Sequence, residues 1–272
     1  MHRDRTKQSY DTALAQELAA IERRELRLTR AAERYRSAPW KAELESRLPD
    51  KVRAALQAAF LSAFQLVFSK GTAVIEKSYD RKKLTQGHRI SDYMFEKQGG
   101  RSSLREMNKS ASDSRLVNLA ITTAEGVGLG ALGVGIPDVP VYVAMLLKGV
   151  YETALQYGFE YGSAAERALI LRMMEASVTR GAKFVELDAQ VDALLRLDAL
   201  PPVDDAALKE RTESCAESFA VDMLLLKSVQ SLPVVGIVGG LANPVYYQRV
   251  LGYVSLKYRK RYLLGKLKSA GG

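Results

Sequence analysis

The chain has very little cysteine and histidine: among its 272 residues there are one cysteine, Cys215, and two histidines. A lone cysteine cannot cross-link its own chain, so a disulfide-stapled scaffold is excluded, and we expect Cys215 to be a small buried residue. Structural zinc sites need four Cys or His ligands and catalytic zinc sites need three protein ligands. We therefore expect no metal, and no motif indicates an organic cofactor.

The sequence also lacks the short motifs of common enzymes. It contains no phosphate-binding G-x-x-x-x-G-K-[ST] loop, no H-E-x-x-H, no calcium-binding loop and no G-x-S-x-G. Gly128, Gly130 and Gly133 fit G-x-G-x-x-G, but a dinucleotide site needs this turn between a strand and a helix, and no strand pattern precedes it. Close helix packing explains these glycines better.

The N-terminus lacks the apolar stretch of a secretory signal, and neither a myristoylation nor a prenylation motif is present. From this we expect a cytoplasmic protein.

Apolar residues make up 47% of the chain and charged residues 26%, which is enough for a sizeable core and a charged surface. Apolar residues recur every three or four positions, and no segment shows the alternation of a strand. The fold class we predict is therefore all-α, a multi-helix bundle. The helices expected from spacing and caps cover 11–36, 50–70, 138–158, 163–179, 188–198, 204–227 and 245–268.

The first of these helices is polar, and Pro39 ends the segment that contains it. We interpret residues 1–37 as a protruding N-terminal helical extension and residues 38–272 as the main helical domain. Within that domain, residues 76–112 are the most polar part of the chain and are predicted to form an exposed basic connection.

Positive charge is concentrated at both ends. Residues 1–110 carry 23 Lys and Arg against 14 Asp and Glu, and the last 24 residues carry seven basic side chains and no acidic one. Such a field attracts phosphates, including those of anionic lipids, although it also serves solubility. The seven predicted anion-binding residues are Arg249, Lys257, Arg259, Lys260, Arg261, Lys266 and Lys268. We do not expect nucleic acid as a partner, because these charges do not lie on one face of the helix and no nucleic-acid-binding signature accompanies them.

Two uncharged or nearly uncharged windows, 126–147 and 228–248, are as long as a membrane span but are interrupted by glycine and proline. They are predicted to form Gly-rich apolar helical hairpin segments that meet in space. Three alternatives stay open: close-packed helices inside a soluble core, a hairpin inserted shallowly into one leaflet, and a true span. The residues of this motif are Gly126, Gly128, Gly130, Gly133, Pro137, Pro140, Gly236, Gly239, Gly240 and Asn243.

Two carboxylates border the first window, Glu125 and Asp138. A carboxylate in apolar surroundings must be hydrogen-bonded, paired with a cation such as Arg167, or must cap a helix. The alternative is a functional pocket, in which these three residues are the only catalytic candidates that the sequence offers.

Four stretches together resemble the EcsC protein family, a bacterial group named for a gene found beside an ABC transporter. They are Ala124–Gly133 with Pro137–Pro140; the helix with Tyr151, Glu152, Tyr157 and Gly158; Glu166–Leu171; and Leu232–Asn243 with Tyr258–Tyr262. On this basis the resemblance extends over about residues 38–265. It implies an all-helical cytoplasmic protein, peripheral to the inner face of the cell membrane and linked to transport or secretion, and it carries over no catalytic residues.

We therefore expect a membrane-associated accessory protein without catalysis, which binds an anionic membrane surface or a membrane protein. The first alternative is a hydrolase acting on a lipid or peptide through a pocket formed by Glu125, Asp138 and Arg167. The second is an interaction module in which the 11–36 helix pairs with another chain, for example in an oligomer.

Overall fold

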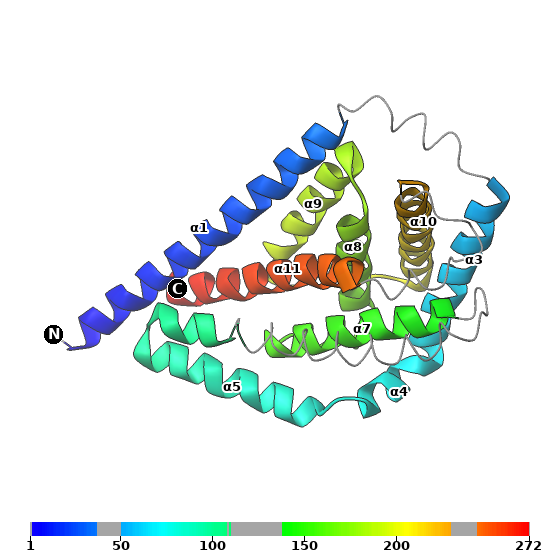
Figure 1. Cartoon of the computed structure of the whole chain (residues 1–272). Helices are drawn as coiled ribbons and strands as arrows, with labels where there is room; N and C mark the ends of the chain where they lie inside the picture. The colour runs from blue at the N-terminus through cyan, green and yellow to red at the C-terminus, as the bar shows by residue number, and fades with distance from the viewer. Residues whose placement is uncertain (1, 37–49, 108, 110–137, 230–243, 272) are drawn as a thin grey trace.

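The computed structural model describes residues 2–36, 50–107, 109, 138–229 and 244–271, and all regular structure in these ranges is helical (Figure 1). The all-α prediction is confirmed. The elements are α1 (His2–Arg36), α3 (Asp50–Leu66), the π-helix η1 (Val67–Gly71), α4 (Thr72–Lys77), α5 (Arg81–Gln98), α7 (Asp138–Gln156), α8 (Ala164–Val178), α9 (Gly181–Leu195), α10 (Asp205–Val229) and α11 (Pro244–Gly271).

Helix α8 lies at the centre and packs against α9, α10 and α11. It is apolar on nearly all sides, as a helix surrounded by others must be, and nearly every residue from Glu166 to Val178 is buried. The backbone N–H of Glu166 donates to Ser163 Oγ at 3.1 Å, which confirms the predicted N-terminal cap. The reciprocal half of the capping box is not made, because the Glu166 carboxylate instead accepts hydrogen bonds from Tyr258 and Arg261 on α11.

Helices α7 and α11 cross closely at Gly149. A β-carbon at this position would lie 2.5 Å from Leu251 Cδ1 and 2.6 Å from Tyr247 Oη, so the ends of these two side chains would have to shift to admit a larger residue. Near the start of the two helices, the rings of Tyr142 and Tyr246 have centroids 6.1 Å apart. The described ends of the two glycine-rich windows are thus helical and adjacent, while 126–137 and 230–243 lie outside the described residues.

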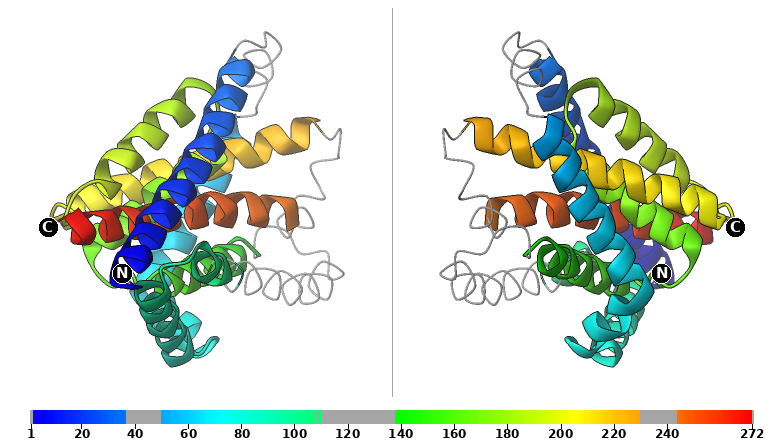
Figure 2. Two further views of the ribbon diagram at one scale, coloured as in Figure 1. Left: turned by 90° about the vertical axis from the view of Figure 1, so that its left-hand side faces the viewer. Right: turned by 90° about the vertical axis from the view of Figure 1, so that its right-hand side faces the viewer.

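Helix α1 runs diagonally across α9 and α11 (Figures 1 and 2) and also contacts α5. Its side chains Leu14 and Ile21 are fully buried, and Glu17 and Glu25 are buried with them. The sequence suggested a separate, protruding extension because the helix is so polar overall. The structure corrects this: the helix covers the body with one narrow face, on which both apolar and paired acidic residues lie.

The predicted exposed connection at 76–112 is also corrected, because most of it is helix. Asp80 caps α5 by accepting a hydrogen bond from the backbone N–H of Lys83 at 2.9 Å, and Gly99, with φ of 62°, ends it. Phe95 is fully buried and stacks on Tyr10 of α1, with ring centroids 4.5 Å apart. Helix α5 therefore packs along α7 and α1 with one face only.

Within the described ranges, one helical stretch is long and apolar enough to cross a membrane by length and composition, Asp50–Ser69, with mean hydropathy 1.3. Its inner face packs on α10 and α7, and the ring of Phe60 lies 5.4 Å from that of Phe219. Its outward positions include small residues such as Ala58 and Ser62. Core helices pass the same test, so this property does not by itself place the helix in a membrane.

Candidate functional site

The seven basic residues predicted to bind anions all form ion pairs with carboxylates of the chain itself. The pairs are Arg249 with Asp222, Lys257 with Glu25, Asp188 and Asp192, Arg259 with Glu17, Lys260 with Glu25 and Asp192, Arg261 with Glu166, Lys266 with Asp92 and Glu96, and Lys268 with Asp198. The carboxylates come from α1, α5, α8, α9, α10 and the turn after α9. Helix α11 is thus connected by charge to most of its neighbours.

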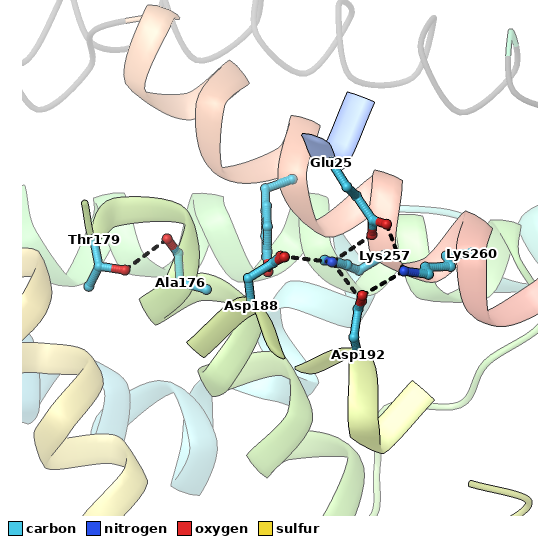
Figure 3. A network of polar contacts seen from close by, with 8 residues as sticks. Glu25, Ala176, Thr179, Asp188, Asp192, Lys257 and Lys260 are labelled. Atoms are coloured by element: carbon cyan, nitrogen blue, oxygen red, sulfur yellow. Dashed lines mark hydrogen bonds and ion pairs between the residues drawn. The ribbon is translucent and has the colours of Figure 1, made fainter. Parts of the chain in front are cut away.

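The centre of this arrangement is a buried cluster of two lysines and three carboxylates (Figure 3). Lys257 Nζ lies 2.6 Å from Glu25 Oε1 and 2.7 Å from oxygens of both Asp188 and Asp192, and its side chain is 0% exposed. Lys260 Nζ lies 2.6 Å from Glu25 and from Asp192. Burial acts to lower the pKa of Lys257, but the three carboxylates outweigh it, so this pKa lies above its ordinary value.

These contacts correct the prediction of a free cationic surface on α11. Lys257 and Lys260 are buried, and an anion could reach them only by displacing Glu25 and Asp192. A count of charges along the sequence cannot separate a solvated lysine from one that is paired inside the fold, since the partners lie as many as 235 positions away. The basic residues of α11 therefore connect this helix to its neighbours through ion pairs.

The catalytic hypothesis finds no assembled pocket in the described part of the chain. Glu125 lies outside the described residues, and Asp138 is described only as the first residue of α7. Arg167 is half-buried, and its guanidinium lies over the ring of Phe68, 5.8 Å from the centroid. Of the glycine-rich motif, only Pro140 is described; it occupies the first turn of α7, where its missing N–H costs nothing. Its other members, Gly126 to Pro137 and Gly236 to Asn243, lie outside the described residues.

The cationic surface that the structure does present lies on the outer face of α5. Its four basic residues are Lys82, Lys83, Arg89 and Lys97, all exposed, and none pairs with a carboxylate in the described part of the chain. Three large apolar side chains lie among them: Ile90 is 64% exposed, Tyr93 58% and Met94 40%. At 3.6 residues per turn these seven residues fall within an arc of roughly 140° on one side of the helix.

No acidic side chain interrupts this arc. The two acidic residues of α5, Asp92 and Glu96, both turn to Lys266 of α11, at 2.6 Å each. Arg81, at the start of the helix, is held by Glu76 and Glu160. Internal pairing therefore separates the charges of α5, with both carboxylates directed to α11 and the four unpaired cations on the outer face.

Helix α1 also presents exposed arginines, but with a different composition. Its outward positions Arg23, Arg27 and Arg30 are interspersed with Glu22, and Leu26 is exposed beside them. Mixed charge and a single apolar side chain are typical of a solvated face. The outer face of α5 is the stronger candidate for a functional surface.

The signals for this surface were present in the sequence. Asp80 and Gly99 mark the ends of a helix, and Leu84, His88 and Phe95 lie four and seven positions apart on what became its inner face. The segment has a low overall hydropathy, because a helix that packs with one narrow face carries polar residues on its other sides. We therefore interpreted it as a polar connection and not as a helix.

A comparison with protein-family models supplies the identification. The model described as the EcsC protein family matches residues 13–263, from within α1 to near the end of α11. The chain belongs to the EcsC protein family. The EcsC match begins 25 residues before the boundary expected near residue 38, so the family domain includes most of α1, as the packing of α1 against α9 and α11 requires. No curated protein and no solved structure matches the chain.

Proposed function

We propose that this EcsC protein is a peripheral membrane protein without catalysis of its own, which binds an anionic bilayer surface through the outer face of α5. The observation that carries the proposal is the combination on one helix face of four unpaired basic side chains with exposed Ile90, Tyr93 and Met94. An accessory role in transport or secretion, at the inner face of the cell membrane, is the setting in which we place this activity.

The chemistry of this face fits the boundary of a bilayer. Lysine and arginine can extend their charged ends to lipid phosphates while their methylene stems lie beside apolar groups. Ile90 and Met94 can enter the acyl boundary, and Tyr93 suits the headgroup level because its ring is apolar and its hydroxyl is polar. Lys97 Nζ already lies 5.6 Å from the centroid of the Tyr93 ring, so charge and aromatic surface are presented together.

The size of the effect follows from the charge. Each basic residue near an anionic membrane contributes about 1 kcal/mol, so replacing all four by glutamine should weaken binding by about 4 kcal/mol, roughly a thousandfold. Glutamine is a good helix former, and the four side chains have no ion-pair partner to lose. The fold should therefore be unchanged, which circular dichroism would verify.

The experiment is sedimentation with vesicles of phosphatidylglycerol and phosphatidylcholine at low and high salt. The wild-type chain should pellet at low salt and less at high salt, and the variant with Lys82, Lys83, Arg89 and Lys97 changed to Gln should stay in the supernatant. The matched control changes Arg23, Arg27, Arg30 and Arg34 of α1 to Gln, an equal loss of charge on another exposed surface.

A second variant, Ile90→Ser/Tyr93→Ser/Met94→Ser, should weaken pelleting without changing the net charge. If the α1 control loses binding as fully as the α5 variant, net charge and not the α5 face is responsible. If the wild-type chain does not pellet at low salt, membrane binding through α5 is refuted. Charge reversal on α11 is a poor test, because it would break ion pairs inside the fold.

A further inference from the structure

A cavity of about 360 Å³ lies between the second half of α1, the turn that joins α8 to α9, and the first half of α11. This volume is within the range of small-molecule sites in proteins. The cavity is distant from the outer face of α5, which lies along the opposite edge of the molecule from α9 (Figures 1 and 2). It is therefore a feature separate from the surface proposed to bind the membrane.

All charged side chains that line this cavity are arginines: Arg24 of α1, Arg180 of the α8–α9 turn and Arg249 of α11. Asp222 of α10 lies behind two of them, with Oδ1 2.9 Å from Arg180 Nη2 and Oδ2 3.1 Å from Arg249 Nη1. Asp222 is buried and does not line the cavity, so it positions both guanidinium groups from behind and balances part of their charge. Arg249 also donates to the carbonyl oxygen of Thr179 at 3.4 Å.

Arg24 has no carboxylate partner in the described part of the chain. Its Nη2 lies over the backbone of Gly252, 3.5 Å from where a β-carbon would be. Three guanidinium groups thus line the cavity, and the charge of at least Arg24 is not balanced by a carboxylate of the described residues. An unbalanced positive charge beside a cavity calls for an anion, because arginine forks bind carboxylate and phosphate oxygens with matched geometry.

The turn that leads into helix α9 borders the cavity, since Thr179 and Arg180 line it. Helix α9 begins at Gly181, directly after Arg180, and no side chain caps its N-terminus. The first amide N–H groups of a helix carry its positive dipole end and favour anions when they are not capped. Gly181 has φ of 60°, so the turn enters the helix through a conformation that suits glycine.

The remainder of the wall is mostly apolar, with Ser177, Thr179 and Gln248 as its polar members. Leu28 of α1, Phe184 of α9 and Tyr253 of α11 line it, and the rings of Phe184 and Tyr253 pack edge to face with centroids 6.0 Å apart. The Tyr253 hydroxyl is occupied elsewhere, since it donates to Asp188 at 2.6 Å. The cavity therefore joins a cationic site and an apolar wall.

We infer that this cavity binds a single-chain anionic amphiphile, with its phosphate or carboxylate head at Arg24, Arg180 and Arg249 and its apolar chain against Leu28, Phe184 and Tyr253. A volume of 360 Å³ corresponds to about twelve water-sized groups. A phosphate head with a chain of six to eight carbons fills this space. A bare anion would leave the apolar wall wet, and a neutral chain would leave the excess charge without a partner.

The test is calorimetric titration of the full chain with octyl phosphate. The wild-type chain should bind it, and Arg24→Gln should bind at least roughly tenfold more weakly, since one charge-assisted interaction is lost. Arg23→Gln is the matched control, because this neighbouring arginine is exposed on α1 and does not line the cavity. It should bind as the wild-type chain does.

Gly252→Leu is designed to fill the cavity. The new β-carbon would meet only Arg24, at an ordinary contact distance, and replacing a helical glycine favours the helix. This variant should keep the wild-type melting temperature or exceed it, and should not bind octyl phosphate. Equal binding by the wild-type chain, Arg24→Gln and Gly252→Leu would overturn the assignment of the site, as would no binding by the wild-type chain at millimolar ligand.

Inorganic phosphate and 1-octanol separate the two halves of the proposal. If phosphate binds as tightly as octyl phosphate, the apolar wall contributes nothing and the ligand is not an amphiphile. If 1-octanol binds as tightly as octyl phosphate, the anion site is refuted. Octanoate should bind at the same site, since the arginines accept either head group.

The amphiphile could come from solution or from a bilayer, and vesicle sedimentation distinguishes these sources. If Arg24→Gln pellets with anionic vesicles as the wild-type chain does but has lost octyl phosphate binding, the ligand is a soluble amphiphile. If it also pellets less while Arg23→Gln does not, a membrane lipid supplies the head group. The α5 variants should bind octyl phosphate normally, so failure of the membrane proposal would be visible separately.

Discussion

Replacing Lys257 by methionine removes the most buried charge of the cluster shown in Figure 3 and keeps the length and volume of the side chain close to the original. The change leaves Glu25, Asp188 and Asp192 without Lys257, and of the described basic residues Lys260 remains paired with Glu25 and Asp192. These carboxylates come from α1 and α9, so the perturbation acts where three helices meet.

The expected cost is large for a single substitution. Removing one partner of a buried ion pair costs about 3–5 kcal/mol, because the charges left behind have lost both water and counterion. A domain of ordinary stability unfolds with 5–15 kcal/mol, so the Lys257→Met variant should remain folded but be clearly weakened. Because Glu25 belongs to α1, the substitution should also raise the exchange rate of the amide hydrogens of α1, relative to the wild-type chain, more than that of the amide hydrogens of α8.

The assay is urea unfolding at neutral pH, with Lys268→Met as the control. Lys268 lies on the same helix and pairs with Asp198, but the two side chains are 46% and 90% exposed. A pair of this kind is worth about 0–1 kcal/mol, so the control should be nearly neutral. A loss for Lys257→Met of less than about 1 kcal/mol, or a loss equal to that of the control, would refute the reasoning.

Acid provides a second check on the same variant. Burial acts to raise the pKa of Asp192, but Lys257 and Lys260 outweigh it, and its pKa lies below the ordinary value of 3.8. The stability that this carboxylate contributes is therefore present above about pH 3.8 and is lost as the pH falls through its lower folded value. The difference between wild type and Lys257→Met should shrink in this acid range. A difference that stays constant down to pH 2 would show that lost packing, and not charge, causes the destabilisation.

Two further pairs of variants test the core. Tyr246→Phe should leave the unfolding free energy unchanged or raise it by up to about 1 kcal/mol, since its buried hydroxyl has no hydrogen-bond partner among the described residues. Tyr258→Phe should lower this free energy by about 1–3 kcal/mol, because that hydroxyl donates to the buried carboxylate of Glu166 at 2.8 Å. Gly149→Ala should destabilise by up to about 2 kcal/mol, because overpacking against Leu251 and Tyr247 costs about 1–3 kcal/mol and the gain from replacing a helical glycine offsets about 1 kcal/mol of this. Gly87→Ala, on α5 with no atom nearby, should stabilise by up to about 1 kcal/mol. Thermal and urea unfolding measure all four; a reversed order within either pair would contradict the packing described above.

The sequence predicted the starts of helices well where the capping side chain and the capped amide are only a few residues apart. The backbone N–H of Ala207 donates to Asp204 Oδ1 at 2.8 Å, as the predicted start of α10 requires, and Ser163 caps α8 in the same way. Cys215 is fully buried on α10, and burial raises the pKa of its thiol well above the ordinary value. Each of these depends on residues within one or two turns, which is the range over which a sequence pattern carries information.

The pairing of charges depends on contacts between residues that are far apart in the sequence. Lys257 and Glu25 are 232 positions apart, and nothing in either neighbourhood indicates that they meet. For the same reason the polar helix α1 was interpreted as an extension. When the basic partner of an acidic residue is not known, an acidic residue at an apolar position of the pattern indicates an exposed helix face. In the structure, Glu17 and Glu25 are the acidic residues that hold α1 to α11.

This internal pairing also explains where the surplus charge of the chain becomes available. The net charge is +9, and the most basic segment by sequence, α11, pairs all seven of its cations with carboxylates of the chain. In doing so it draws Asp92 and Glu96 toward α11, so the cations left on α5 face outward without counterions among the described residues. If that separation is what makes α5 a membrane-binding surface, Lys266→Met should weaken vesicle binding although Lys266 does not lie on the outer face. The two released carboxylates, Asp92 and Glu96, would then reduce the positive potential of α5. Sedimentation with anionic vesicles at low salt would measure the loss of binding. Unchanged binding would show that these two carboxylates have no influence on the outer face.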